Sequence, residues 1–219
     1  MNELTYANAA TGGAPTFSAS GGDTNIDINL VPKGTGALKA GGVVVATAGL
    51  QTCWIPAAAM VARTTNGAAA GTVEMATNKN MFKTLDFDTA TSEYAQFSIQ
   101  MPKSWNKGTV TAAFVWSHAA TTTNFGVTFA LQAVALSNDD AGDVAFGTEQ
   151  IAADTGGTTN DIYVSPVTSA ITIAGTPAAN DYVQFQVRRA VADAGDTMAI
   201  DARLHGVQLY YTTDAATDA

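Results

Sequence analysis

Hydrophobic and polar residues alternate along much of the chain after residue 80, and a period of two is the spacing of β-strands. In the stretch EYAQFSIQM, Phe97, Ile99 and Met101 share one face, while glutamine and serine side chains share the other. The same alternation recurs at residues 109–118 and 181–189. One face of each predicted strand therefore packs in a core, and the other faces water.

Further strands are predicted from the same pattern, and they cover residues 81–87, 125–133, 148–152, 162–167, 171–174 and 198–211. In the last of these the apolar positions change phase at His205 and Gly206. We expect a β-bulge there, because one extra residue returns the apolar side chains to the core and glycine tolerates unusual backbone angles.

About eight strands without an amphipathic helix predict an all-β fold, an antiparallel β-sandwich of jelly-roll type. The alanine-rich stretch after Cys53 allows a helical turn at most, because Pro56 and several glycines interrupt it. We assign residues 51–219 to the sandwich. Residues 1–50 are predicted to form an extended N-terminal arm with a short β element. The arm has too few apolar residues for its own core, so it requires a partner surface on the sandwich or on other copies of the chain.

A glycine-rich motif with a lysine, NLVPKGTG, lies in this arm. It does not have the spacing of a phosphate-binding loop, because Lys33 precedes the glycines. The motif is typical of a turn between two short strands, in which Pro32 fixes one backbone angle and Gly34 or Gly36 supplies a positive one.

The charge of the chain excludes several classes of partner. Ten basic residues stand against 19 acidic ones, which gives a net charge of −9. Nucleic-acid binding requires clustered basic residues, so we expect none. No apolar run reaches the roughly 20 residues that span a bilayer, so membrane insertion is not expected either. The N-terminus lacks a secretory signal, which favours synthesis in a cytoplasm.

No catalytic or metal motif is present in the sequence. Cys53 lies in an apolar context typical of a buried thiol, and His118 and His205 have no ligands at zinc-type spacing. There is no nucleophile elbow and no compact pair of carboxylates. We therefore expect neither an enzyme nor a cofactor.

Acidic loops such as SNDDAGD offer oxygen ligands that calcium prefers. Aspartate, asparagine and glycine are also the ordinary residues of hairpin loops, and the spacing is not that of an EF-hand. The sequence favours turns over a calcium site, and melting in the presence of a chelator distinguishes the two.

Two aromatic residues are candidates for contact with a glycan or a partner protein. Trp105 lies in a turn-like segment, and Tyr210 falls on the outer face of the last strand. Aromatic side chains on a surface suit such contacts, since they combine an apolar ring with a polar group.

The segment NIDINLVPKGTGALKAGG resembles an element of tailed-bacteriophage virion proteins, including fibre, spike and head-decoration proteins, where it precedes a β-rich domain. The segment DYVQFQVRRAVADAGDTMAIDARLHGVQLYY is similar to the last strands of a phage β-sandwich module. Together they cover somewhat under a quarter of the chain.

The resemblance implies a non-enzymatic structural component of the virion, made in the host cytoplasm. Its arm docks to other virion proteins or to sister subunits, and its sandwich is exposed. A homo-oligomer is expected, with a trimer favoured. The alternative is a carbohydrate-binding β-sandwich module that contacts a host surface glycan.

Overall fold

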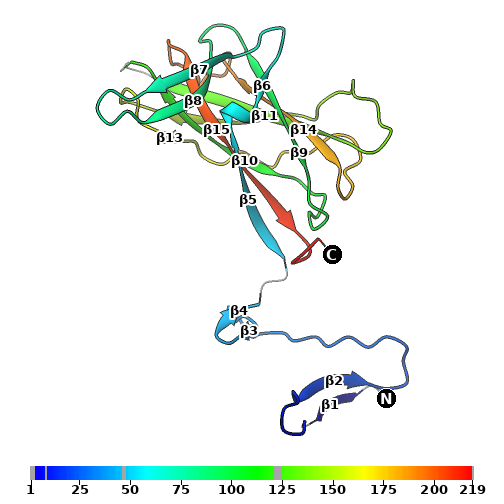
Figure 1. Ribbon diagram of the computed structural model, residues 1–219. Helices are drawn as coiled ribbons and strands as arrows, with labels where there is room; N and C mark the ends of the chain where they lie inside the picture. The colour runs from blue at the N-terminus through cyan, green and yellow to red at the C-terminus, as the bar shows by residue number, and fades with distance from the viewer. Residues whose placement is uncertain (1–2, 8, 46–47, 121–124, 219) are drawn as a thin grey trace. The chain divides into compact units, whose positions relative to one another are not determined.

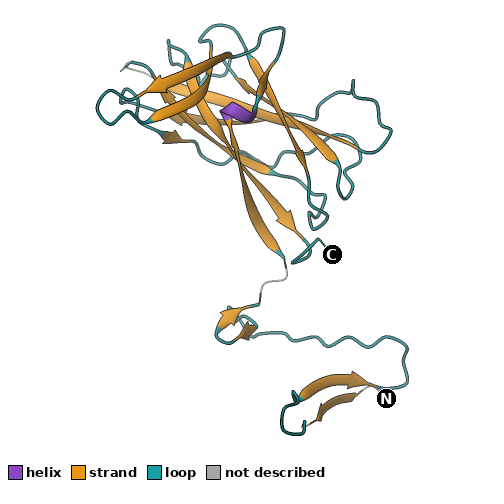
Figure 2. Cartoon of the chain, in the orientation of Figure 1, coloured by secondary structure: helices purple, strands orange, loops and turns teal. Residues whose placement is uncertain are grey.

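The computed structural model describes residues 3–7, 9–45, 48–120 and 125–218. Within these ranges the regular structure is almost entirely β-strand, apart from one 3-10 turn, η1 (Ala57–Ala59) (Figure 2). No helix in the described ranges has the length and apolar character that a bilayer crossing requires. The predicted all-β fold is confirmed.

The chain divides into compact units of residues 1–46 and 47–219, whereas the sequence places the boundary at residue 50. The earlier boundary reflects strand β5 (Gly49–Pro56), which belongs to the second unit. The first unit holds two antiparallel hairpins. One pairs β1 (Glu3–Ala7) with β2 (Thr16–Ser20), and the other pairs β3 (Lys39–Ala40) with β4 (Val43–Val44).

The PKGTG motif forms a turn in the first unit. The N–H of Gly36 donates to the carbonyl of Lys33 at 3.1 Å, and Gly34 has a positive φ of 61°. The sequence predicts that this turn joins two short strands, but residues 26–30 form no strand. A strand requires a neighbour for its backbone hydrogen bonds, and the described part of the first unit supplies none at residues 21–38.

The second unit contains the remaining strands. They are β5, β6 (Val61–Ala62), β7 (Ala69–Glu74), β8 (Met81–Phe87), β9 (Tyr94–Gln100), β10 (Thr111–His118), β11 (Gly126–Leu136), β12 (Gln150–Thr155), β13 (Tyr163–Val164), β14 (Tyr182–Arg189) and β15 (Ala202–Thr213).

These strands form a jelly roll (Figure 1). One sheet has the order β13-β10-β15-β8-β7, and the other has the order β12-β11-β14-β9-β6. From β8 to β15 successive strands alternate between the two sheets, except that β11 and β12 are neighbours in the second sheet, and all ladders are antiparallel. This alternation is the jelly-roll topology, so the predicted sandwich is confirmed. Strand β5 adds to the first sheet beside β15.

Phenylalanine side chains from both sheets join the two layers. Phe129 of β11 contacts Phe114 of β10 and Phe87 of β8, with ring centroids 5.3 and 5.7 Å apart. Phe97 and Phe185 stack at 4.9 Å on neighbouring strands of the second sheet. All five are buried. The inner faces predicted for these strands are therefore confirmed.

The predicted β-bulge is confirmed in β15. Val115 pairs with Gly206 and Trp116 pairs with Leu204, so His205 is the extra residue. At the same point β15 exchanges its neighbour on the other side, from β8 before the bulge to β5 after it. The bulge therefore lies where β15 shifts register against β10 on one side and changes its partner from β8 to β5 on the other.

Steric space, and not backbone conformation, requires the glycine at this bulge. Gly206 is absent from the residues with positive φ, contrary to the reason expected from the sequence. A Cβ at this position would lie 2.5 Å from the Trp54 ring and 2.5 Å from the carbonyl oxygen of Ile55. Glycine permits this close approach of β5 and its tryptophan.

Some strand predictions are wrong. Residues 171–174 make only isolated bridges, in which Ile171 pairs with Val110 and Ala174 pairs with Val134. The structure also contains β5 and β7, which the sequence pattern does not reveal, because both carry small or polar residues at several positions that alternation would make apolar.

A buried arginine connects the end of β14 to the loop that leads into β15. The guanidinium of Arg189 binds both carboxylate oxygens of Asp196, at 2.8 and 2.9 Å. It also donates to the carbonyls of Ile200 and Met198, and to that of Phe87 at the end of β8. Arg189 is fully buried, and so is its partner side chain. Such a charge is tolerated inside a protein only with partners of this kind.

We predict that Arg189→Met lowers the free energy of unfolding by about 3–5 kcal/mol, because it leaves the Asp196 carboxylate buried without its partner. Arg188→Met is the matched control. Arg188 is the adjacent residue, and its ion pair with Glu149 is partly exposed. The control should lose about 1 kcal/mol or less. Urea unfolding measures both, and equal losses would contradict the prediction.

Because His205 is buried at the bulge, the stability of the fold should depend on pH. Burial, together with the charge of Arg203, lowers the pKa of His205 from its ordinary value of 6.5. The unfolded chain therefore binds this proton more readily than the folded chain does. Stability contributed by neutral His205 is present above pH 6.5 and is lost as the pH falls toward the folded-state pKa.

We expect the melting temperature to fall between about pH 7.5 and 5.5, and to fall less in His205→Gln. Glutamine keeps a polar group near Ser117, to which His205 is hydrogen-bonded at 2.8 Å, but it does not titrate. Calorimetric scans across this range make the comparison. Parallel pH profiles of the two proteins would show that His205 is not the group responsible.

Candidate functional site

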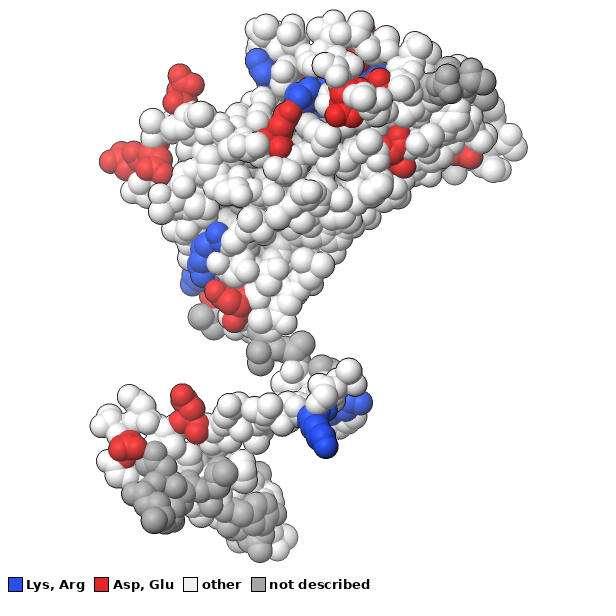
Figure 3. Space-filling view, turned by 180° about the vertical axis from the view of Figure 1, so that it is seen from behind, with Lys and Arg blue, Asp and Glu red and all other residues white. Residues whose placement is uncertain are grey.

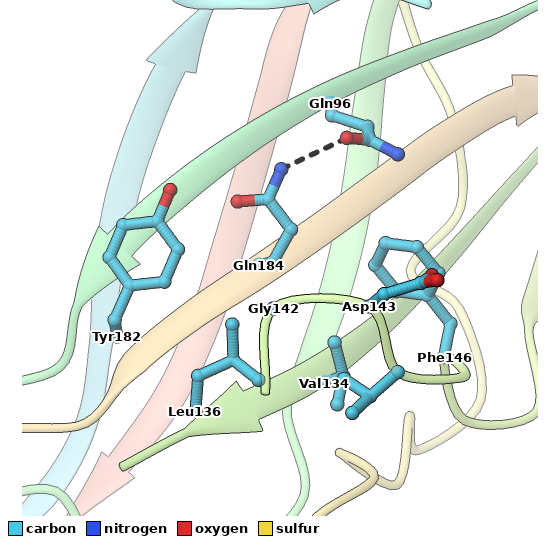
Figure 4. A pocket seen from close by; sticks show the side chains of 9 residues that line it. Gln96, Val134, Leu136, Gly142, Asp143, Phe146, Tyr182 and Gln184 are labelled. Carbon is cyan, nitrogen blue, oxygen red and sulfur yellow. Dashed lines mark hydrogen bonds between the residues drawn. The ribbon is translucent and has the colours of Figure 1, made fainter. Parts of the chain in front are cut away.

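A groove of about 420 Å³ lies on the outer face of the second sheet (Figure 4). Its floor is made by outward side chains of three neighbouring strands, β9, β14 and β11. Its side is made by residues 142–146, in the connection from β11 to β12. The lining residues are Gln96, Val134, Leu136, Gly142, Asp143, Val144, Phe146, Tyr182 and Gln184.

The alternation of β14 places two of these side chains. Val183 and Phe185 point into the core and are fully buried. The intervening residues, Tyr182 and Gln184, consequently point outward. In the ladders on either side Gln184 pairs with Ser98 of β9 and with Val134 of β11.

Glutamine side chains on this face form a hydrogen-bonded chain. The amide nitrogen of Gln184 donates to the amide oxygen of Gln96 at 3.1 Å, as Figure 4 shows. The amide nitrogen of Gln96 in turn donates to the oxygen of Gln186 at 3.0 Å. Each bond fixes the orientation of an amide, which has two donors and an acceptor to offer. The carbonyl oxygen of Gln184 points to the side of the groove where Tyr182 stands (Figure 4).

Apolar groups form the rest of the wall. The side chain of Tyr182 is 45% exposed and that of Val144 is 40% exposed, while Leu136 and Phe146 are half-buried. Asp143 is the single ionisable acid in the lining, and this fully described set of residues contains no lysine, arginine or histidine. The groove can therefore hydrogen-bond and pack against a ligand.

The acidic loop after β11 forms turns. The carboxylate of Asp140 accepts the N–H of Ser137 at 2.8 Å, and Asp139 has a positive φ of 71°. Among the described residues no three acidic, histidine or cysteine side chains gather as they would around a metal ion. The N–H of Asp140 also donates to the carbonyl of Ser137 at 3.2 Å, so residues 137–140 form a hydrogen-bonded turn.

Trp105 does not form the surface contact predicted for it. Its side chain is fully buried, because its segment is bridged to the C-terminal end of β15 through Thr213, and Asn106 donates to Thr212. This pairing covers the segment and places the indole in the core. Trp105 is therefore a structural residue.

Tyr210 lies on the outer face of the first sheet, as predicted, and is half-buried. Its hydroxyl donates to Gln208 at 2.9 Å. The exposed tryptophan of this face is Trp54, which is 47% exposed and lies over Gly206. The structure does not bring Trp105 and Tyr210 together, because one is in the core and the other is on the surface.

Of the remaining reactive side chains, the two histidines are buried, while Cys53, expected to be buried, is half-buried. Burial raises the pKa of the Cys53 thiol above its ordinary value. His118 is buried, with its Nδ1 2.7 Å from the carbonyl oxygen of Ala120 and its ring stacked near Phe125 and Tyr163. The partner of His205, Ser117, is also buried. None of these groups lines the groove.

Sequence reasoning missed the groove. Gln96 and Gln184 match the outward positions of half-buried strands, which is a pattern shared by any solvated face. Tyr182 begins a strand, and nothing in its sequence context distinguishes it from other surface tyrosines. What brings these residues together is the order of strands in the sheet, since Gln96 and Gln184 are far apart in the chain.

Comparison with known proteins finds similarity in structure but not in sequence. No protein-family model matches the chain, and no curated sequence matches it. The family 11 carbohydrate-binding module from Clostridium thermocellum, in complex with a β-1,3-1,4-mixed-linked tetrasaccharide, is similar in structure with a TM-score of 0.39 and 8% identity, over 74% of this chain and 95% of that one.

A second structure, the cycloisomaltooligosaccharide glucanotransferase of Paenibacillus sp. with cycloisomaltoheptaose, has a TM-score of 0.34 and 16% identity. The match covers 74% of this chain and 18% of that one. Similarities of this size assign no activity to the chain.

The turn geometry of the acidic loop predicts that calcium does not stabilise the fold. We expect the same melting temperature in calcium and in excess chelator, because the Asp140 carboxylate is engaged by a backbone N–H in a turn. Differential scanning fluorimetry provides the comparison. A higher melting temperature in calcium, abolished in Asp140→Asn and Asp143→Asn, would contradict the prediction.

Proposed function

We propose that this protein is a non-enzymatic structural component of a tailed-bacteriophage particle. In this proposal residues 1–46 attach the chain to other virion proteins or to sister subunits, and the jelly roll is displayed. It is made in the host cytoplasm and functions on the virion as a homo-oligomer, with a trimer favoured.

One observation carries the proposal, namely that the described side chains of residues 1–46 form no buried core. Every described side chain in this unit is exposed or half-buried. The apolar residues Ile28, Leu30, Val31 and Leu38 are exposed to between 39% and 78%. Two-stranded hairpins of this size are marginally stable alone in water. A partner surface that covers these side chains would supply the missing burial.

The second unit has the opposite character. Its core is closed between two sheets, which bury Phe87, Phe97, Phe114, Phe129 and Phe185 without a further chain. The region that resembles a phage module spans β14 and β15, each of which has neighbours on both sides in its sheet, and the loop held by Arg189. This resemblance supports a stable module displayed by the arm. The phage setting itself rests on the two resembling segments of the sequence.

We predict that substitutions in the arm abolish incorporation into particles. In Leu30→Ser/Val31→Ser two exposed apolar side chains of the arm become polar. The full chain should then fail to co-sediment with particles assembled from a phage genome that encodes it. Val61→Ser is the matched control, since Val61 is 72% exposed but belongs to the sandwich, and it should be incorporated normally.

The oligomeric state is measured on the same proteins by light scattering after size exclusion. A full-length chain that remains monomeric, and that never sediments with particles, would refute the proposal. Equal incorporation of the arm variant and the control would assign attachment to the sandwich instead.

A further inference from the structure

The groove on the outer face of the second sheet is lined by residues of the sandwich alone. We propose that it binds a neutral carbohydrate, with Tyr182 as the stacking surface and with Gln96 and Gln184 as the groups that recognise hydroxyls. The inference goes beyond the structural role and depends only on residues of the sandwich.

The amide chain suits a polyol. A sugar hydroxyl both donates and accepts a hydrogen bond, and so does a glutamine amide. Gln184 is bound to Gln96, and Gln96 is bound to Gln186, so the amides are held in place before a ligand arrives. Preorganisation of this kind reduces the conformational entropy that binding would otherwise remove.

The tyrosine and the apolar residues beside the amides suit the C–H faces of a sugar ring. A pyranose ring has apolar C–H groups on its faces, and the face of an aromatic ring carries partial negative charge that attracts them. Tyr182 is nearly half exposed, and Val144, which also lines the groove, is exposed as well. Figure 4 shows the tyrosine ring standing at one end of the lining, beside Gln184. Hydroxyls and C–H faces thus meet complementary groups within one groove.

Charge selects against anionic ligands. The lining contains the Asp143 carboxylate and no cation. The whole chain carries a net charge of −9, and Figure 3 shows few basic side chains on the face that it presents. Sialylated or phosphorylated ligands would meet repulsion without a compensating partner. A neutral glycan meets none.

The position of the groove also disfavours an extended peptide. Peptides that bind to sheets usually add as a strand at an edge, where backbone groups are free. Under the groove β14 is paired with β9 on one side and with β11 on the other. The other side of β11 is bonded there to Gly147 and Ala174, through the backbone of Ala133 and Ala135. A volume of about 420 Å³ is at the small end of ligand pockets, which suits one or two sugar rings of a longer chain.

The test uses the full chain and four probes: maltotetraose, cellotetraose, tetra-N-acetylchitotetraose and the anionic sialyllactose. Saturation-transfer NMR detects binding, and titration calorimetry measures the affinity. We expect at least one neutral probe to bind and sialyllactose not to bind. Tyr182→Ala and Gln184→Ala should each weaken that binding by about tenfold or more, which corresponds to the loss of one stacking or hydrogen-bonding contact.

The first sheet offers a matched control. Gln208 and Tyr210 are the same two residue types at the same spacing of two, on the outer face of the other sheet. Gln208→Ala and Tyr210→Ala should leave the affinity unchanged. In the unsubstituted chain, the side-chain amide resonances of Gln96 and Gln184 should shift on addition of the probe, which tests the site without any substitution.

Three results would overturn the proposal: no binding by any neutral probe, equal loss in the control variants, or binding of sialyllactose as tight as that of the neutral probes. These variants leave residues 1–46 intact. Failure of glycan binding and failure of particle attachment are therefore distinguishable.

Discussion

The fold depends on the buried ion pair between Arg189 and Asp196, because it fixes the loop through which the chain passes from one sheet to the other. Arg189 ends β14 in the second sheet, and the loop it holds leads into β15 in the first. Its contact with the Phe87 carbonyl adds the end of β8 to the same point. A guanidinium has five donors in a fixed plane, so it can hold a carboxylate and several carbonyls together. A hydrophobic residue could fill this space but could not orient the loop.

Strand β15, which follows this loop, has two different neighbours on one side, β8 and β5, and the bulge lies where one replaces the other. Before His205 the inward residues of β15 are in register with β8, and after it they are in register with β5. Without the extra residue, every side chain beyond the bulge would change faces. The exchange lets β5 join the first sheet, with Trp54 packed where only a glycine fits. The sheet thus gains a strand at the start of the second unit.

Alternation in the sequence was sufficient to predict the inner faces of the main strands, the bulge and the jelly-roll class, since all three depend on which side of a strand is apolar. It could not predict contacts made between distant segments. The burial of Trp105 depends on a bridge to Thr213, more than a hundred residues away in the chain. The residues at 171–174 have the composition of a strand but lie where only single bridges form. The proposed groove has the same origin, because strand order and the returning loop bring its residues together.

The chain has few charged side chains, and the core and the groove differ in how they use them. Only 13% of residues are charged, and one ion pair is completely enclosed at the junction of the sheets. The outer face of the second sheet is organised differently, by amides that orient one another without net charge. Recognition through amides and a tyrosine ring needs no ionised partner, and salt screens it little. The junction, by contrast, is held by a buried ion pair. The enclosed charges thus lie at this junction, while the groove is lined by amides, apolar groups and the single carboxylate of Asp143.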